Sequence, residues 1–316
     1  MSAWRRVRSL TVIGALGVAL PACGGGGPGS PPPSPAGEAA SSHAAGAAGT
    51  GGAASARAAA LLAQPGAGQP RFPAPTTVDN PMFPLLPGTR FSYRGTVVEG
   101  GSATPHTVVF TVTDLTKVVA GVRTLVALDQ DFLRGRLQEQ ELAFFAQDAS
   151  GNVWNFGEYP EEYDHGRLTG APDTWLTGTG GAHGGIHMLG QPAVGVRYTE
   201  GRVRAIEFYD VSQVVSAHRV TCLGSRCLRR VLMVDEWSPG DPAGGHQIKY
   251  YAPGIGLVRV GARGGDAREF LRLVAVRHLS QPALARARAA ALTMDRRAYR
   301  VSKIYRVTRP AGAPAS

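Results

Sequence analysis

The stretch that decides the fold is residues 107–113, Thr107-Val108-Val109-Phe110-Thr111-Val112-Thr113. Val108, Phe110 and Val112 recur at every second position, and this period of two is typical of a half-buried β-strand. Nearly all residues of the stretch are β-branched or aromatic, the types that are enriched in strands. The stretch therefore predicts a sheet with one face against a core.

Further strand-like runs follow along the chain, with turn-forming residues between them. They cover approximately residues 122–128, 153–156, 203–215, 227–237, 247–251, 255–261 and 268–278. No long helical period interrupts them between residues 90 and 278. Short strands at this spacing predict a mainly β domain over residues 80–280, built as a strongly curved antiparallel sheet (a half-barrel) or as a sandwich.

An amphipathic helix is predicted in the basic C-terminal segment 281–316. Ser280 is a suitable cap, and Pro282 fits the first turn. At about 100° per residue, one side of this helix is apolar and the other carries arginines. The apolar side holds Leu284, Ala291, Leu292, Ala298 and Tyr299, and the basic side holds Arg286, Arg296, Arg297 and Arg300. These arginines either face solvent or contact an anionic surface, and both interpretations remain open.

Cys222 and Cys227 flank Leu223-Gly224-Ser225-Arg226, which is typical of a hairpin loop between two strands. Residues that face each other across a hairpin have Cα atoms about 4.5–5.5 Å apart, which lies within the range of a disulfide. No third candidate metal ligand lies close to the pair in the sequence. We therefore predict a structural disulfide, which contributes about 2 kcal/mol for so short a loop.

Residues 1–22 have the parts of a secretory signal. Arginines at positions 5, 6 and 8 precede an apolar run over residues 10–20, which is too short to span a bilayer. The run ends in Leu20-Pro21-Ala22-Cys23, which resembles the lipobox of bacterial lipoproteins. The resemblance implies that Cys23 is acylated and that the acyl chains, palmitate among them, make the membrane a partner of the chain.

Residues 23–79 are dominated by Gly, Ala, Pro and Ser. Such a segment cannot bury enough apolar surface to offset the entropy of ordering it, so we predict a disordered tether. The formal net charge is +10, but residues 1–22 and 281–316 contribute all of the excess, and residues 23–280 are neutral overall. The high charge is therefore no argument for nucleic acid as a partner.

Residues 165–195 are Gly-rich and weakly periodic, which predicts a long loop. Within it, His183-Gly184-Gly185-Ile186-His187 has a spacing found in metal sites, although zinc would need a further ligand such as His165 or Asp173. The two histidines of this stretch have two interpretations. They are ligands of a metal-dependent hydrolase, or they are solvated loop residues.

Acidic residues gather at Glu158, Glu161, Glu162 and Asp164. Paired carboxylates serve acid–base chemistry or calcium binding, but an exposed, charged strand edge explains them without either. The sequence has no Gly-x-Ser-x-Gly elbow and no phosphate-binding glycine loop between a strand and a helix. It thus indicates no catalytic residue and no cofactor, and it favours a protein that is not an enzyme.

Three blocks of sequence stand out between residues 80 and 275. They are Asn80-Pro81-Met82-Phe83-Pro84-Leu85 with Pro87-Gly88-Thr89, Phe144-Phe145-Ala146-Gln147-Asp148 with Gly151-Asn152-Val153-Trp154, and Lys249-Tyr250-Tyr251-Ala252-Pro253-Gly254-Ile255-Gly256-Leu257-Val258. Together they resemble an uncharacterised family of bacterial secreted proteins and lipoproteins. The resemblance implies an all-β envelope protein and brings no activity. In the third block, Pro253-Gly254 also predicts the turn of a hairpin.

These features predict a lipid-anchored protein of the bacterial cell envelope, on the periplasmic or the cell-surface side of a membrane. The expected role is a non-catalytic binding or accessory module. A concave apolar sheet face would suit a lipid ligand, and another protein of the envelope is the second candidate partner. The alternative function is the metal-dependent hydrolase with His183 and His187 as ligands.

Overall fold

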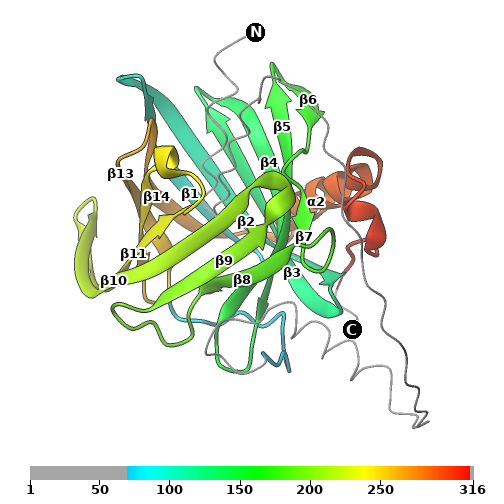
Figure 1. Cartoon of the computed structure of the whole chain (residues 1–316), viewed down its shortest axis with the longest axis horizontal. Helices are drawn as coiled ribbons and strands as arrows, with labels where there is room; N and C mark the ends of the chain where they lie inside the picture. The colour runs from blue at the N-terminus through cyan, green and yellow to red at the C-terminus, as the bar shows by residue number, and fades with distance from the viewer. Residues whose placement is uncertain (1–69, 314–316) are drawn as a thin grey trace, which may run out of the picture.

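The computed structural model describes residues 70–313, in which one antiparallel sheet closes on itself as a barrel (Figure 1). Twelve strands form the closed ring in the order β1-β2-β3-β4-β5-β8-β9-β10-β11-β12-β13-β14, and β14 pairs back to β1. The short strands β6 and β7 pair with β5 outside this ring. The expectations for residues 1–69, which include the signal peptide and Cys23, lie outside the described residues.

The strands have the following bounds: β1 Thr89–Glu99, β2 Ser102–Val119, β3 Val122–Leu133, β4 Arg136–Gln147, β5 Val153–Asp164, β6 Arg167–Gly170, β7 Trp175–Leu176, β8 His183–Met188, β9 Arg197–Val203, β10 Phe208–Leu223, β11 Arg226–Trp237, β12 His246–Ala252, β13 Gly256–Arg263 and β14 Ala267–His278. Helix α2 follows at Gln281–Val301, and short 3₁₀ helices lie at η2 Arg204–Ile206, η3 Pro242–Gly244 and η4 Tyr305–Val307.

The predicted fold class, mainly antiparallel β with a C-terminal helix, is confirmed. The strongly curved sheet forms a closed barrel and not a half-barrel. The prediction of a loop over residues 165–195 is wrong, since this segment contains β6, β7 and β8. Strand β8 bridges β5 and β9 and so completes the ring. Gly185 permits this pairing, because a Cβ there would lie 2.1 Å from the carbonyl oxygen of Thr199 in β9.

Two predicted hairpins are present with the expected pairing. Cys222 pairs with Cys227 across the β10–β11 turn, and the two sulfurs form the predicted disulfide. Ala252 pairs with Gly256 at the end of the β12–β13 hairpin. Gly254 lies between them with a φ of 72°, the left-handed conformation that a Pro-Gly turn requires.

Residues 70–88 cover one end of the barrel, and Val78, Asn80, Phe83 and Leu85 among them are buried. Asn80 Nδ2 donates to the carbonyl oxygens of Gly151 and Leu189, which ties this segment to two hairpin loops. Phe83 enters the barrel and packs against Phe145, with ring centroids 5.7 Å apart. The same end of the interior contains a large apolar cluster, with Phe110, Phe145, Trp154, Met188 and Tyr251 among its members.

Helix α2 packs on the outside of the barrel over β2 and β4. Leu284, Ala291 and Ala298 of the predicted apolar side are buried. Lys117 of β2 fastens the helix, because its Nζ donates to Asp295 Oδ1 at 3.1 Å and to the carbonyl oxygen of Arg309 at 2.7 Å. The side chain of the predicted cap, Ser280, makes no capping hydrogen bond. Within residues 70–313, no helix combines the length and apolar character needed to cross a bilayer.

Candidate binding site at the charged end of the barrel

The half of the barrel interior away from Phe83 is lined by acidic side chains. We name them the acidic belt, and each is less than a tenth exposed. Its members are Asp129, Asp131, Glu139, Glu141, Glu158, Glu200, Asp210, Glu236 and Glu269. They come from seven strands of the ring, since β3, β4, β5, β9, β10, β11 and β14 each contribute at least one. The negative charge of Asp210 in β10 helps to raise the pKa of Glu158 in β5. These two strands are not neighbours in the ring, so the interaction crosses the barrel interior.

Two acid pairs of the belt lie directly opposite each other on neighbouring strands. Asp129 is in register with Glu141, and Asp131 is in register with Glu139. Like charges in directly opposed positions destabilise a sheet. These positions therefore require a bound proton or a nearby cation.

Lys249 supplies one such cation in the centre of the belt. Its Nζ donates to both carboxylate oxygens of Glu236, at 2.7 Å each. Ser212 continues this network by donating to Glu200 Oε1 at 2.5 Å. Burial alone would lower the pKa of Lys249, but the charges of Glu236 and Glu200 raise it above its usual value, so the ammonium stays charged.

His106 supplies the second cation. Its Nε2 lies 2.6 Å from Asp131 Oδ1, and its Nδ1 lies 3.1 Å from Glu269 Oε1. Burial would lower the pKa of His106, but its hydrogen bonds to these two carboxylates outweigh burial and raise the pKa to about 10. The imidazole is therefore protonated at neutral pH.

The belt carboxyls outnumber these two cations, and the pKa values of several of them are raised. Burial and the charge of Asp131 raise the pKa of Asp129 to about 8. Burial raises the pKa of Glu236 to about 8, with a further contribution from Glu200. Burial also raises the pKa of Glu158 to about 8, against the hydrogen bonds it receives from Trp175 and Asn155. A bound cation would therefore favour the loss of protons from these carboxyls and would be attracted by the carboxylates that form.

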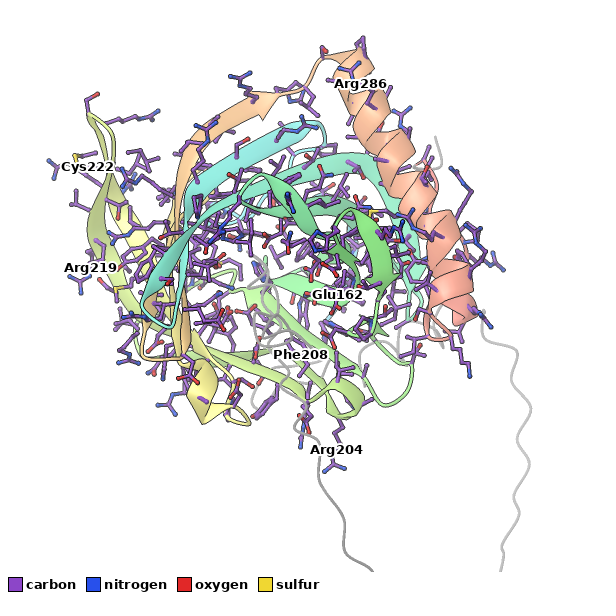
Figure 2. The ribbon with its side chains drawn as sticks, turned by 90° about the horizontal axis from the view of Figure 1, so that it is seen from above. Glu162, Arg204, Phe208, Arg219, Cys222 and Arg286 are labelled. Atoms are coloured by element: carbon purple, nitrogen blue, oxygen red, sulfur yellow. A yellow bond between two sulfur atoms is a disulfide. The ribbon has the colours of Figure 1, made fainter. Side chains whose placement is uncertain are left out.

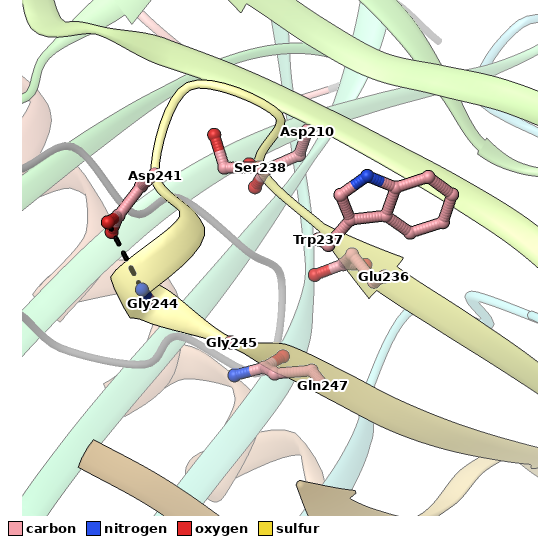
Figure 3. Close-up of a pocket in the computed structure, with 8 residues that line it drawn as sticks. All are labelled: Asp210, Glu236, Trp237, Ser238, Asp241, Gly244, Gly245 and Gln247. Carbon is pink, nitrogen blue, oxygen red and sulfur yellow. Dashed lines mark hydrogen bonds between the residues drawn. The ribbon is translucent and has the colours of Figure 1, made fainter. Parts of the chain in front are cut away.

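A recess opens from the belt toward the surface beside η3 (Figure 3). Its cavity volume is about 20 Å³, which is room for a group of the size of a water molecule or an ammonium. Its lining consists of Asp210, Glu236, Trp237, Ser238, Asp241, Gly244, Gly245 and Gln247. Three carboxyl groups therefore face one small space, at the junction of β10, β11 and β12.

Gln247 is the side chain of the recess that most directly indicates a ligand. It is 7% exposed, and its Nε2 donates to Glu269 Oε2 at 3.2 Å. Its Oε1 has no hydrogen-bond partner among the described residues. Because a buried carbonyl oxygen without a donor is costly, the recess offers an acceptor to a donor group that enters it.

The predicted metal pair is not brought together at a site. His187 is buried in the interior, where its Nδ1 lies 3.1 Å from Glu200 Oε2 and its ring packs 4.4 Å from that of Phe83. Burial lowers the pKa of His187 to about 3. His183, at the start of β8, is exposed, and the described residues hold no group of three His, Cys, Asp or Glu side chains in a metal-binding arrangement. The interpretation of both histidines as solvated loop residues is also wrong for His187.

The predicted arginine face of α2 is divided. Arg286, Arg296 and Arg300 are exposed. Arg297 is half-buried and binds both carboxylate oxygens of Glu161, with its Nε 2.5 Å from Oε1. Arg297 is therefore an internal ion pair and not part of a free basic face. Arg288, which is not on the predicted basic side, likewise binds both carboxylate oxygens of Asp114 in β2.

The acidic group at 158–164 is likewise divided between interior and surface. Glu158 and Glu161 are buried, against the expectation of an exposed charged edge, whereas Asp164 is exposed. A sequence signal for the belt existed in Asp129-Gln130-Asp131 and Glu139-Gln140-Glu141. Acids two residues apart in apolar strand-like runs share one sheet face, and here that face is the interior.

No protein-family model matches the chain, and no curated protein matches it in sequence. Two solved structures have some likeness to it. One is a predicted exported protein of YmcC-like fold from Bacteroides fragilis, with 13% identity, a TM-score of 0.33, and coverage of 62% of this chain and 98% of that one. The other is a predicted lipoprotein from Parabacteroides distasonis, with 10% identity, a TM-score of 0.29 and the same coverage. Scores this low transfer no function to this chain.

Proposed function

We propose that this chain is a lipid-anchored envelope protein that acts as a non-catalytic binding module, and that its ligand carries a primary ammonium group. The anchor rests on Cys23 and the lipobox-like residues before it. The ligand chemistry rests on one observation, the recess in which Asp210, Glu236 and the unpaired Oε1 of Gln247 converge.

An ammonium group fits the recess by charge and by hydrogen bonding. It has three donors and no acceptor, and the recess supplies the carboxylate of Asp210, the unpaired Oδ2 of Asp241 and the Oε1 of Gln247 as acceptors. The belt already holds an ammonium of this kind, since Lys249 Nζ lies between the two oxygens of Glu236. A ligand ammonium would repeat this arrangement one layer nearer the surface.

A lipid acyl chain is less well matched to the interior. The apolar end is filled by fully buried side chains such as Trp154, Phe145 and Tyr251, which an acyl chain would have to displace. The hydrolase alternative is less well supported. His187 is buried and contacts Glu200, whereas His183 is exposed. The amine-binding module is therefore the function that the site supports best.

Calorimetric titration with a simple alkylamine tests the ligand, with the alcohol of equal size as the neutral probe. The amine should bind and the alcohol should not. Since burial and neighbouring carboxyls raise the pKa values of Asp210 and Glu236, binding of a cation should favour their ionisation and release protons, and the heat should depend on the ionisation enthalpy of the buffer. Absence of amine binding at millimolar concentrations would contradict the proposal.

Asp210→Asn keeps the shape of the recess and removes its ionisable oxygen. It should weaken amine binding at least tenfold, a loss of about 1.4 kcal/mol. Asp266→Asn is the matched control, because Asp266 is an exposed acid on the neighbouring β13–β14 turn and does not line the recess. Equal affinities of the two variants would remove Asp210 from the site.

The anchor is tested separately by Cys23→Ser. The substituted protein should move from the membrane fraction to the soluble fraction after removal of its signal. Retention of the processed variant in the membrane would contradict the assignment of Cys23, without bearing on the recess.

A further inference from the structure

The hairpin of β10 and β11 extends beyond the pairing of the barrel wall. β10 pairs with β9 only as far as Gln213, and β11 pairs with β12 only from Leu232 onward. Between these limits the two strands pair with each other. We name residues 215–231 the basic arm, and Figure 2 shows it projecting at one side of the molecule, with Arg219 and Cys222 labelled.

The basic arm has an unusual charge. Its arginines Arg219, Arg226, Arg229 and Arg230 are all exposed, as is His218. No Asp or Glu occurs between Val215 and Val234, so the arm contains no acid that could neutralise them. Two arginines of α2, Arg288 and Arg297, differ in this respect because carboxylates bind them.

A backbone irregularity increases the exposure of this charge. Arg219 pairs with Val231, and Thr221 pairs with Leu228, so Arg229 and Arg230 together face the single residue Val220. Arg230 has a φ of 55°, a left-handed conformation that costs a residue other than glycine about 1–2 kcal/mol. This bulge lets two successive arginines both reach solvent, where a regular strand would turn one of them inward.

The basic arm also has apolar side chains on its surface, and its inner side is fixed. Val215 is 39% exposed and Val220 is 54% exposed. On the inner side Leu228 belongs to the apolar core cluster, and Leu223 packs against it. The Cys222–Cys227 disulfide closes the tip. The arm is therefore held in place, and its four arginines and these two valines are exposed.

We propose that the basic arm docks on the surface of an anionic phospholipid membrane. Arginines near such a surface are attracted by its negative potential, and exposed valines gain by leaving water at the lipid interface. A soluble polyanion would satisfy the arginines but would leave the valines in water. Docking adds a second membrane contact to the proposed acyl anchor, and it does not depend on the recess.

Sedimentation with lipid vesicles tests this inference on a protein that lacks only residues 1–23, so that no acyl chain contributes. The protein should bind vesicles of phosphatidylglycerol mixed with phosphatidylcholine, and not vesicles of phosphatidylcholine alone. Binding should weaken steeply between about 0.1 M and about 1 M salt, as the Debye length falls from about 10 Å to about 3 Å. Equal binding to both vesicle types, or to neither, would overturn the proposal.

Replacement of Arg219, Arg226, Arg229 and Arg230 by Gln should lower the vesicle partition coefficient at least a hundredfold, since each arginine near an anionic leaflet contributes roughly a fivefold factor. The matched control replaces Arg286, Arg296, Arg300 and Lys303, four exposed cations at α2 and just after it, by Gln. It removes the same charge and should change the partition less than fivefold. An equal loss in both variants would overturn the assignment to the basic arm.

Val220→Ser separates a membrane from a soluble polyanion. It should lower vesicle binding severalfold and leave binding to dextran sulfate unchanged. If both the wild type and this variant prefer dextran sulfate to vesicles of equal charge concentration, the partner is a soluble polyanion and the membrane proposal fails. Circular dichroism of each variant checks that the barrel is folded.

Discussion

The two ends of the barrel interior are stabilised by different physical effects. At the end covered by residues 70–88, Phe83 packs among Phe110, Phe145 and Tyr251, with ring centroids 5.7–6.5 Å apart. At the other end, acidic side chains lie opposite each other on neighbouring strands. The cations Lys249 and His106 bind some of these carboxylates. Apolar packing depends little on pH, whereas a carboxyl-rich interior depends on which protons and cations are bound.

This difference explains where a ligand site is expected. At the apolar end, aromatic side chains fill the space around Phe83, and His187 Nε2 is a polar atom there without a hydrogen-bond partner among the described residues. At the charged end, Gln247 Oε1, Asp129 Oδ2 and Glu141 Oε1 have no hydrogen-bond partner in the described part of the chain. The charged end is therefore where binding, pH and stability are coupled, and the predictions below test that contrast.

The largest effect is expected at the apolar end. Phe83→Ala removes the ring that closes this end and should lower the free energy of unfolding by about 3–5 kcal/mol. The loss should be the same at about pH 6 and about pH 9, because no ionisable group is removed. Urea unfolding at both values measures it. A loss that changes strongly with pH would show that the two ends are not independent.

At the charged end, Lys249→Met removes the cation that neutralises Glu236. Without Lys249 the pKa of Glu236 rises further, so at about pH 9 the variant must either protonate Glu236 or bury an unpaired charge, and the loss should reach about 3 kcal/mol. At about pH 5 Glu236 takes up a proton, so the loss should be much smaller. Unfolding measurements across this range check the prediction, and an equal loss at both pH values would contradict it.

The sequence predicted the apolar end better than the charged end. Alternation in residues 107–113 and the turns at Gly254 and at Cys222–Cys227 are local signals, and they predicted strands and hairpins that the structure contains. Closure of the barrel was not predictable in this way, because β8 lies in a Gly-rich segment whose pairing depends on β5 and β9, remote in sequence. The belt was missed because acids in strands are ordinarily assigned to the solvent face.

Individual histidines and arginines also depend on contacts with residues that are remote in sequence. Spacing placed His183 and His187 together, but one is exposed and the other lies in the barrel interior. Helical periodicity placed Arg297 on a free face, but Glu161, 136 positions earlier in the chain, binds it. Long-range ion pairs of this kind leave no trace in a local pattern.

A smaller effect is expected from pH on the unaltered protein. Asp129, Glu158 and Glu236 have pKa values of about 8 when folded and near 4 when unfolded. The folded state thus keeps protons that the unfolded chain has lost, so stability falls as pH rises from about 5 to about 8. His106, with its pKa of about 10, extends the fall to higher pH.

Urea unfolding between about pH 5 and about pH 9 should therefore show a total fall of at least about 2 kcal/mol. Amine binding should reduce this fall if the recess takes a cation, since the ligand stabilises the ionised carboxyls. His187 acts in the opposite direction only below its ordinary pKa of 6.5, because it stays neutral in the folded state down to about pH 3. A stability that is constant from pH 5 to pH 9, or that rises, would contradict the raised pKa values of the belt.

The smallest effect is expected from Glu141→Gln. Glu141 lies opposite Asp129, and burial together with the neighbouring carboxyls raises its pKa well above the usual value. At about pH 5 the wild-type side chain is neutral, so the amide should leave stability nearly unchanged. At about pH 9 Asp129 is ionised, and the amide cannot add a second charge opposite it, so the substitution should raise the free energy of unfolding by up to about 1 kcal/mol. The exposed Glu207→Gln is the control and should change stability by less than about 0.5 kcal/mol at either pH. A destabilised Glu141→Gln at high pH would mean that the carboxylate is held by a cation, and it would move the cation-binding part of the belt from the recess to the β3–β4 pair.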